Sequence, residues 1–130
     1  DIDQRLSSYR RLSRMTEVKE VSEFKGELLD RFGSLPDPAE NLLLKIMLKI
    51  LARKAAVQKF DLAGRVLVLN FSESHLSKPK GIVDMVIAEP KRFEILPDNV
   101  LKMKMISYSP RQLVDEAKNI LKEISQRVNG

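Results

Sequence analysis

The sequence contains no cysteine and no tryptophan, and its single histidine is His75. Without cysteine the chain has neither a disulfide framework nor a thiolate metal site, which fits a reducing compartment. A zinc site needs several nitrogen, sulfur or carboxylate ligands at suitable spacing, and one histidine in a polar loop does not supply them. We therefore expect no metal site, and we expect His75 to have an incidental role.

Several patterns typical of enzymes and membrane proteins are also missing. No glycine-rich loop with a following lysine is present to hold a phosphate group. No apolar run is long enough to span a bilayer, and the start shows no signal-peptide pattern. The serines beside His75 in "SESHLS" have no acidic partner that completes a triad. We therefore expect a domain that is no enzyme and holds no cofactor. Because the first residue is Asp1, we expect a piece of a larger protein.

The composition is typical of a helix-rich globular protein. Hydrophobic residues make up 43% of the 130 positions and charged residues 32%, while glycine occurs five times. This is enough apolar material for one core, so we expect a single domain over 1–130. The net charge of +5 favours a nucleic acid or an acidic protein as partner. A basic surface that only faces solvent explains the same charge, and an aromatic content of 5% disfavours a single-strand binder.

The first part of the chain, 1–56, is predicted to be helical. Apolar residues recur at steps of three and four over 3–15, 17–32 and 38–56, which is the spacing of one buried helix side. Thr16 is the expected N-cap of the second helix. Helical spacing assigns four residues of that helix to the core: Val18, Val21, Leu28 and Phe32.

The period changes at Val57, where a β-rich part over 57–108 is predicted. Two hairpins flank a short helix over 78–89, and a long amphipathic helix occupies 109–129. Turns are expected at Ala63-Gly64 and at Pro97-Asp98-Asn99. The short helix is expected to bury Ile82, Val83, Val86 and Ile87. The last helix is expected to bury Leu113, Ala117, Ile120, Ile124 and Val128. This order predicts an α+β fold, in which a helical N-terminal half packs on a small, mostly antiparallel β-sheet with a C-terminal helix.

An acidic stripe marks the second helix. At about 100° per residue, four carboxylates fall together on a side different from the apolar one: Glu20, Glu23, Glu27 and Asp30. Asp30 lies in the last turn, where the helix dipole disfavours a negative charge, whereas Arg31 is well placed. A residue that breaks a local rule is a candidate for a function elsewhere. A solvated helix face explains the stripe equally well, and acid–base chemistry by Glu27 and Asp30 lacks any sign of a pocket.

Three segments in one order resemble a known family. They are "RLSSYRRL", "ELLDRFGSLPDPAENLL" and "LKILARKAAVQKFD", within Asp1 to Asp61. Together they resemble the C-terminal domain of the bacterial transcription-repair coupling factor (Mfd). From Leu62 onward only length and pattern fit. At Ala56 the family commonly has glycine before the strand, which leaves the local turn open.

The resemblance implies a function that the residues alone do not show. Proteins of this family are ATP-driven DNA translocases that displace stalled RNA polymerase and recruit the repair protein UvrA in the bacterial cytoplasm. ATP and magnesium belong to a motor upstream of this domain. The C-terminal domain is implied to be regulatory, packing on the protein's own UvrA-binding module and masking it. The family's acidic "E-x-x-D-R" contact corresponds to Glu27, Asp30 and Arg31, and the stripe extends it to Glu20 and Glu23.

Two alternatives use the basic first helix instead. It carries four arginines that can contact phosphate in a nucleic-acid-binding module: Arg5, Arg10, Arg11 and Arg14. The same helix can also serve only to join this domain to the translocase.

Overall fold

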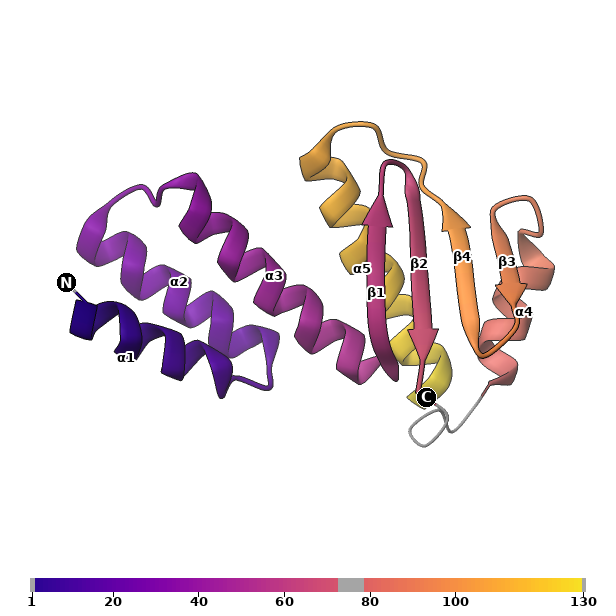
Figure 1. The fold of residues 1–130 in the computed structure, drawn as a ribbon, viewed down its shortest axis with the longest axis horizontal. Coiled ribbons are helices and arrows are strands. Elements are labelled where there is room, and N and C mark those ends of the chain that lie inside the picture. The colour runs from indigo at the N-terminus through magenta and orange to yellow at the C-terminus, as the bar shows by residue number, and fades with distance from the viewer. Residues whose placement is uncertain (1, 73–78, 130) are drawn as a thin grey trace. The chain divides into compact units, whose positions relative to one another are not determined.

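The structure is a computed structural model that describes the backbone of residues 2–72 and 79–129 (Figure 1). Side chains are described from residue 7 onward within these ranges, so Arg5 and His75 lie outside the described side chains. The chain divides into two compact units, Asp1–Ile50 and Leu51–Gly130, and the boundary falls within a helix. The single domain expected from the sequence stays a prediction.

The first unit is helical, and it contains α1 (Ile2–Ser13), α2 (Val18–Phe32) and most of α3 (Asp37–Lys54). Its core is formed by buried residues that recur at helical spacing: Leu12, Met15, Val21, Phe24, Leu43 and Ile50. Val18 and Leu28 pack against this cluster, as the sequence predicts. The N-cap of α2 is Glu17 and not Thr16, because Glu17 forms a capping box with Glu20.

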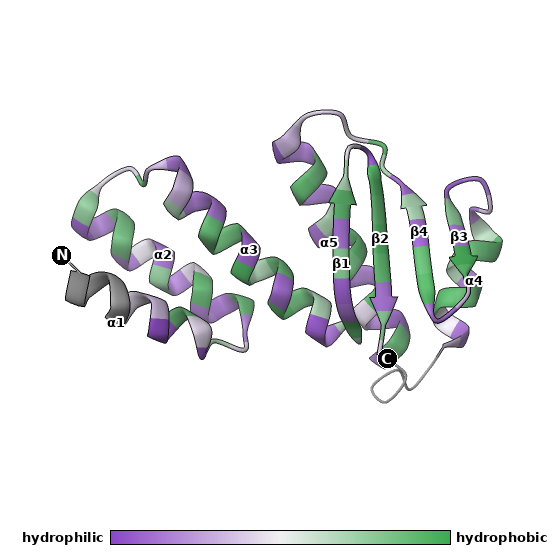
Figure 2. Cartoon of the chain, in the orientation of Figure 1, coloured by the Kyte–Doolittle hydropathy of each residue, from purple (hydrophilic) through white to green (hydrophobic). Residues whose placement is uncertain are grey.

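The second unit is built on a four-stranded sheet of β1 (Val57–Ala63), β2 (Val66–Phe71), β3 (Phe93–Leu96) and β4 (Val100–Lys104). The strand order is β1-β2-β4-β3, and all neighbours are antiparallel. Figure 2 shows that β2 is hydrophobic for most of its length. The predicted α+β class with a small antiparallel sheet and a C-terminal helix is confirmed.

Alternating burial fixes which face of the sheet is inside. Leu67 and Leu69 of β2, and Leu101 and Met103 of β4, are almost fully buried. Figure 1 shows α5 (Pro110–Asn129) behind β1 and β2. The predicted buried residues of α5 are all confirmed, and Leu121 joins them. One apolar side of a long helix therefore covers one face of the sheet.

Both hairpin turns contain residues with positive φ. The first turn is Gly64-Arg65, one residue later than expected, and Gly64 has a φ of 61°. In the second turn, Asp98 and Asn99 have φ of 65° and 61°. Aspartate and asparagine tolerate this left-handed region better than most residues, so this turn was readable from the sequence.

The short helix α4 (Lys80–Ala88) buries fewer residues than the sequence predicts. Ile82 and Met85 are buried, whereas Val83 and Ile87 are exposed, so their predicted core role is wrong. The reason is the tight crossing with α5 at Gly81. A Cβ atom built there would lie 2.6 Å from the backbone oxygen of Arg127. Such a close approach directs one narrow side of α4 inward and leaves the rest in solvent.

Helix α3 ends at Lys54, and Ala56 makes the turn into β1 with a φ of 61°. The turn that the sequence left open at Ala56 therefore lies in the left-handed region, where a side chain is strained. The turn is held by hydrogen bonds from Ala56 N to Arg53 O, at 3.1 Å, and from Ser72 N to Ala56 O, at 2.9 Å.

We predict that Ala56→Gly raises the free energy of unfolding by about 1 kcal/mol, because it relieves the left-handed strain. Urea denaturation of the two proteins measures the difference. The matched control is Ala55→Gly, which is fully buried without a positive φ and should lower stability. A loss of stability at both positions would contradict the strain at Ala56.

Candidate functional site

Helix α2 carries all five residues of the predicted interaction surface. Glu20, Glu23, Glu27 and Asp30 are exposed, while Val21 and Phe24 of the same helix are buried. The helix thus presents its carboxylates to solvent on the side away from the core, as the period of the sequence indicates. Their individual contacts differ, and these contacts decide what each carboxylate can offer a partner.

Glu20 holds the start of the helix. Its Oε1 atom accepts hydrogen bonds from the backbone N–H of Glu17 at 3.2 Å and of Thr16 at 3.3 Å. These donors are unsatisfied by the helix itself, so the carboxylate stabilises the N-terminus. Glu23 lies 3.9 Å from Lys19 in an exposed pair four positions apart. Such a pair contributes at most about 0.5 kcal/mol, so a partner can bind Glu23 in place of Lys19 at little cost.

Glu27 is bound by an arginine of the neighbouring helix. The two terminal nitrogens of Arg11 donate to its carboxylate oxygens at 2.7 and 2.9 Å. The Arg11 guanidinium also lies 4.7 Å from the ring centroid of Phe24. Hydrogen bonding from Arg11 lowers the pKa of Glu27 below its ordinary 4.5, against a smaller opposing effect of desolvation. The bidentate pair therefore ties α1 to α2 through a carboxylate of the predicted surface.

Asp30 and Arg31 lie in the last turn of α2. The described part of the chain gives Asp30 no ion-pair partner, and its side chain is exposed. The guanidinium of Arg31 lies 5.5 Å from the ring centroid of Phe32 instead of against a carboxylate. Among the carboxylates of this surface, Asp30 is therefore the one least engaged by other described residues of the chain.

Phe32 is exposed at 59%, so its predicted place in the core is wrong. Gly33 ends α2 with a φ of 74°, and its N–H donates to Leu29 O at 2.9 Å. The chain turns away at this point, and Leu35 packs against the core beyond it. Helical periodicity places Phe32 on the apolar side of α2, but the hydrophobic core does not extend as far as the Phe32 ring.

A groove of about 590 Å³ lies beside this surface. Its lining comes from α1, α2 and the connection between them: Ser7, Arg10, Arg11, Arg14, Met15, Glu20 and Glu23. Arg10 and Arg14 are exposed there, whereas Arg11 is occupied by Glu27. Two glutamates in the same lining oppose the binding of a phosphate chain, because like charges repel it at close range.

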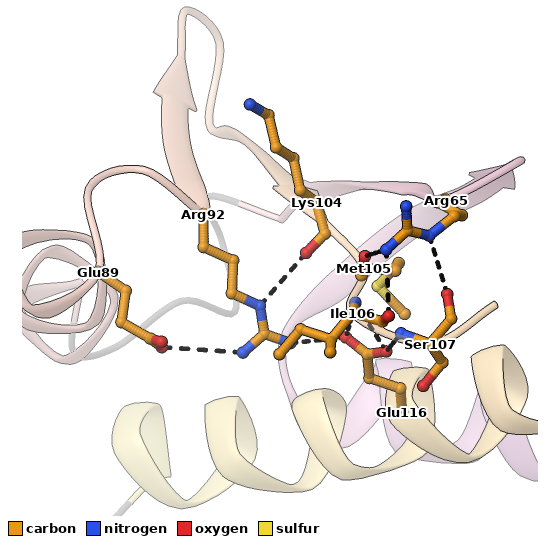
Figure 3. Close-up of polar contacts among 8 residues, drawn as sticks. All are labelled: Arg65, Glu89, Arg92, Lys104, Met105, Ile106, Ser107 and Glu116. Atoms are coloured by element: carbon orange, nitrogen blue, oxygen red, sulfur yellow. Dashed lines mark hydrogen bonds and ion pairs between the residues drawn. The ribbon is translucent and has the colours of Figure 1, made fainter.

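A second polar cluster lies in the β-rich unit, and sequence reasoning missed it (Figure 3). The carboxylate of Glu116 on α5 accepts the backbone N–H of Ile106 at 2.9 Å and of Ser107 at 2.8 Å. It also accepts a terminal N–H of Arg92 at 2.6 Å. Burial by itself raises the pKa of Glu116, but these donors outweigh it, so the pKa lies below 4.5.

Arg65, in the β1–β2 turn, completes this cluster (Figure 3). It donates to the backbone oxygens of Met105, Ile106 and Ser107 at 2.9, 3.1 and 3.0 Å. Its guanidinium lies 3.8 Å from the ring centroid of Tyr108. Arg65 and Glu116 hold the connection between β4 and α5 from opposite sides, so the cluster has a structural role.

Two kinds of site are absent from residues 2–72 and 79–129, the part of the chain that the structure describes. No helix in these ranges is both long and apolar enough to cross a membrane. Within the same ranges, no group of three or more acidic or histidine side chains is arranged to hold a metal ion.

Comparison with known proteins decides the family. The sequence pattern described as the TRCF domain matches residues 1–82, more than half of the chain. The chain belongs to the TRCF domain family. This TRCF domain is similar to the transcription-repair-coupling factor of Escherichia coli (strain K12), with 32% identity over 106 residues, 82% of this chain and 9% of the relative. The corresponding protein of Myxococcus xanthus is 28% identical over 130 residues, 96% of this chain and 10% of the relative.

A solved structure has the same fold. The crystal structure of a C-terminal domain of transcription-repair coupling factor matches the TRCF domain with a TM-score of 0.78 and 16% identity. The match covers 99% of this chain and 83% of that chain. The resemblance read from the three sequence segments is thereby confirmed. The chain spans about a tenth of the length of the curated relatives described above.

We predict that Arg11→Gln lowers the stability of the TRCF domain at pH 7, because the variant loses both hydrogen bonds to Glu27. The pKa of Glu27 is lowered in the folded state, so the pair stabilises the fold above the unfolded pKa. This contribution is lost as the pH falls through the folded pKa, below 4.5. The urea midpoints of the two proteins should therefore differ at pH 7 and converge as the pH falls through the folded-state pKa of Glu27.

The matched control is Arg10→Gln, which removes the same charge from an exposed neighbour in the last turn of α1. Its urea midpoint should differ less from that of the unchanged chain, and this difference should not disappear as the pH is lowered. Equal effects of the two variants at both pH values would speak against a stabilising Arg11–Glu27 pair.

We predict that Glu116→Gln lowers the free energy of unfolding by about 2 kcal/mol at pH 7, since charged hydrogen bonds at a site only 12% exposed are lost. Because the pKa of Glu116 is lowered in the folded state, its carboxylate stabilises the fold at pH values above the unfolded-state pKa. This stabilisation is lost as the pH falls through the folded-state pKa. The variant should therefore lose less stability on acidification than the unchanged chain. Asp115→Asn, an exposed change on the same helix, is the control and should have little effect.

Proposed function

We propose that this TRCF domain is a non-catalytic regulatory domain of a bacterial transcription-repair coupling factor. In this proposal it packs on the UvrA-binding module of the same protein and masks it until that protein engages stalled RNA polymerase. UvrA recruitment for nucleotide-excision repair then follows release. The ATP-driven DNA motor with its magnesium belongs to another part of the protein, and the setting is the bacterial cytoplasm. Membership of the TRCF domain family supports this proposal.

The observation that carries the proposal is the acidic side of α2 near its end. Glu27 and Asp30 are three positions apart, so both lie on one side of the helix and can face one partner surface. Asp30 has no ion-pair partner in the described part of the chain, although it lies at the unfavourable end of the helix dipole. A basic partner surface resolves this placement, because arginine binds carboxylates in a bidentate manner.

The contacts are weak individually, and this suits a reversible mask. An exposed ion pair contributes about 0–1 kcal/mol. Linkage within one chain raises the effective concentration to about millimolar, so a small number of such pairs is enough for docking. An assembly of this strength can be opened by a second partner that binds the released state better.

Glu27 contributes to docking in a way that depends on Arg11. Its carboxylate already accepts two hydrogen bonds, and a carboxylate has about four lone-pair positions. A partner arginine therefore binds the remaining positions, and Arg11 fixes the direction in which they point. Asp30 is available in full. We expect Asp30 to contribute more to affinity than Glu27.

The test is calorimetric titration of this chain with the isolated UvrA-binding module of the same protein, up to near-millimolar concentration. We predict that Glu27→Lys with Asp30→Lys abolishes binding. Asp30→Lys alone should remove most of it, while leaving the Arg11–Glu27 pair intact. Circular dichroism confirms that each variant is folded.

The control is Asp84→Lys with Glu94→Lys, which makes the same change of net charge at exposed positions of the β-rich unit. Its affinity should match that of the unchanged chain. Equal weakening by both double variants would mean that net charge and not the α2 surface governs binding. Absence of binding by the unchanged chain would rule out the docking proposal.

A nucleic-acid-binding module is the second candidate function, and the exposed Arg10 and Arg14 in the groove favour it. Binding of a DNA duplex by this route should fall steeply with salt. It should be weakened by Arg10→Gln with Arg14→Gln and unaffected by Asp30→Lys. The same calorimeter separates the two candidates, because each predicts loss with a different variant.

A further inference from the structure

Arg31 is the one cation among the five residues of the predicted interaction surface, and helical spacing gives it an internal partner. It follows Glu27 by four positions, so the two side chains lie on the same side of α2. A glutamate four positions before a cation is also the order that a helix favours for an ion pair. This pair does not form, and the described part of the chain gives Arg31 no carboxylate within ion-pair distance.

The reason is that Glu27 is already occupied. Its two carboxylate oxygens accept the terminal nitrogens of Arg11 at 2.7 and 2.9 Å. A bidentate pair of this kind is stronger and more defined in direction than a pair with a single contact. The guanidinium of Arg11 is held in addition by the buried Phe24, whose ring centroid lies 4.7 Å away. Arg11 therefore competes successfully with Arg31 for this carboxylate.

Arg31 lies over the exposed ring of Phe32 instead, with 5.5 Å between its guanidinium and the ring centroid. This distance is close to the outer limit of about 6 Å for a cation–π contact, so the ring holds Arg31 weakly. Among the described residues, none accepts a hydrogen bond from the Arg31 side chain. The N–H donors of its guanidinium are therefore all available to a partner.

We propose that Arg11 is a positioning residue of the docking contact: by occupying Glu27, it keeps Arg31 free to bind a carboxylate of the partner module. Arg11 itself stays outside the contact and decides which group Arg31 pairs with. This inference rests on the proposed function, because the partner is the same UvrA-binding module. It adds an acidic group of the partner to the basic group that binds Asp30.

The partner surface then has to match two opposite charges. Asp30 and Arg31 are neighbours in the chain and lie about 100° apart around the helix, so they contact different places on the partner. A surface that is only basic attracts Asp30 and repels Arg31, whereas a surface with a basic and an acidic group side by side satisfies both. The pair therefore discriminates against basic surfaces in general.

The test measures how much affinity for the isolated UvrA-binding module is lost through Arg31→Gln in several backgrounds, by the same calorimetric titration. In the unchanged chain the loss should be about three- to fivefold, the size of one exposed ion pair. In Arg11→Gln the same change should have almost no effect, because the vacated Glu27 already binds Arg31. In Arg11→Gln with Glu27→Gln the loss should return, because a neutral side chain no longer captures Arg31.

The matched control background is Arg10→Gln, which removes an equal charge from an exposed neighbour on α1 and should leave the effect of Arg31→Gln unchanged. Circular dichroism confirms that every variant is folded. An Arg11 with a purely structural role would not restore the loss when Glu27 is neutralised. A loss of equal size in the unchanged chain and in Arg11→Gln overturns the positioning role.

Charge reversal identifies the partner group that faces Arg31. Arg31→Glu should bind more weakly than Arg31→Gln, because two carboxylates then face each other. Equal affinity of these two variants, or tighter binding by Arg31→Glu, overturns the proposed carboxylate of the partner.

The exchange of partners by Arg31 can also be followed without the UvrA-binding module. In nuclear magnetic resonance spectra, the ring current of Phe32 shifts the side-chain protons of Arg31. These ring-current shifts should shrink in Arg11→Gln, and they should persist in Arg10→Gln and in Arg11→Gln with Glu27→Gln. Shifts that stay unchanged in Arg11→Gln overturn the inference, whether or not the chain docks.

The two proposals fail in different ways. Binding that Asp30→Lys abolishes, with affinity unchanged in Arg31→Gln, overturns this inference and leaves the docking proposal standing. Absence of binding by the unchanged chain overturns both.

Discussion

The β-rich unit depends on the burial of one sheet face under one helix. The buried stripe of α5 recurs at steps of three and four, and the buried residues of β2 and β4 alternate, so two different periods meet along one apolar layer. Burying each large side chain stabilises the fold by about 1.5–3 kcal/mol. The connection between β4 and α5 lies outside this layer, and its backbone groups need other hydrogen-bond partners. Arg65 and Glu116 supply these hydrogen bonds, so the polar cluster is a consequence of the layer (Figure 3).

In the helical unit, α2 serves the core and the surface at once. The carboxylates on its exposed side are not equivalent, because Glu20 caps the helix and Glu27 binds Arg11. Asp30 in the last turn has no ion-pair partner in the described part of the chain, and Glu23 has only a weak, exposed pair with Lys19. The sequence shows a stripe of four carboxylates along the whole helix, whereas the structure leaves fewer of them available to a partner. The proposed docking contact is therefore small, and a small contact suits an interaction that has to open.

Much of the fold was predictable because local periods determine it. The stripe of α5, the alternation in β4 and the glycine and asparagine of the turns are all readable within short windows. Contacts between distant residues were not readable: Arg11 and Glu27 are sixteen positions apart, and Glu116 serves a loop through backbone N–H groups. Phe32, Val83 and Ile87 were misassigned for a related reason. Helical spacing gives the direction of a side chain, but it does not say where the core ends.

Gly81 is constrained by packing within the chain and not by contact with a partner. No side chain fits between α4 and the backbone of Arg127, so we expect glycine to persist at this position in any relative that keeps this helix crossing. Phe32 has no such steric constraint, because its side chain is 59% exposed. Persistence through divergence would therefore single out a packing residue in α4.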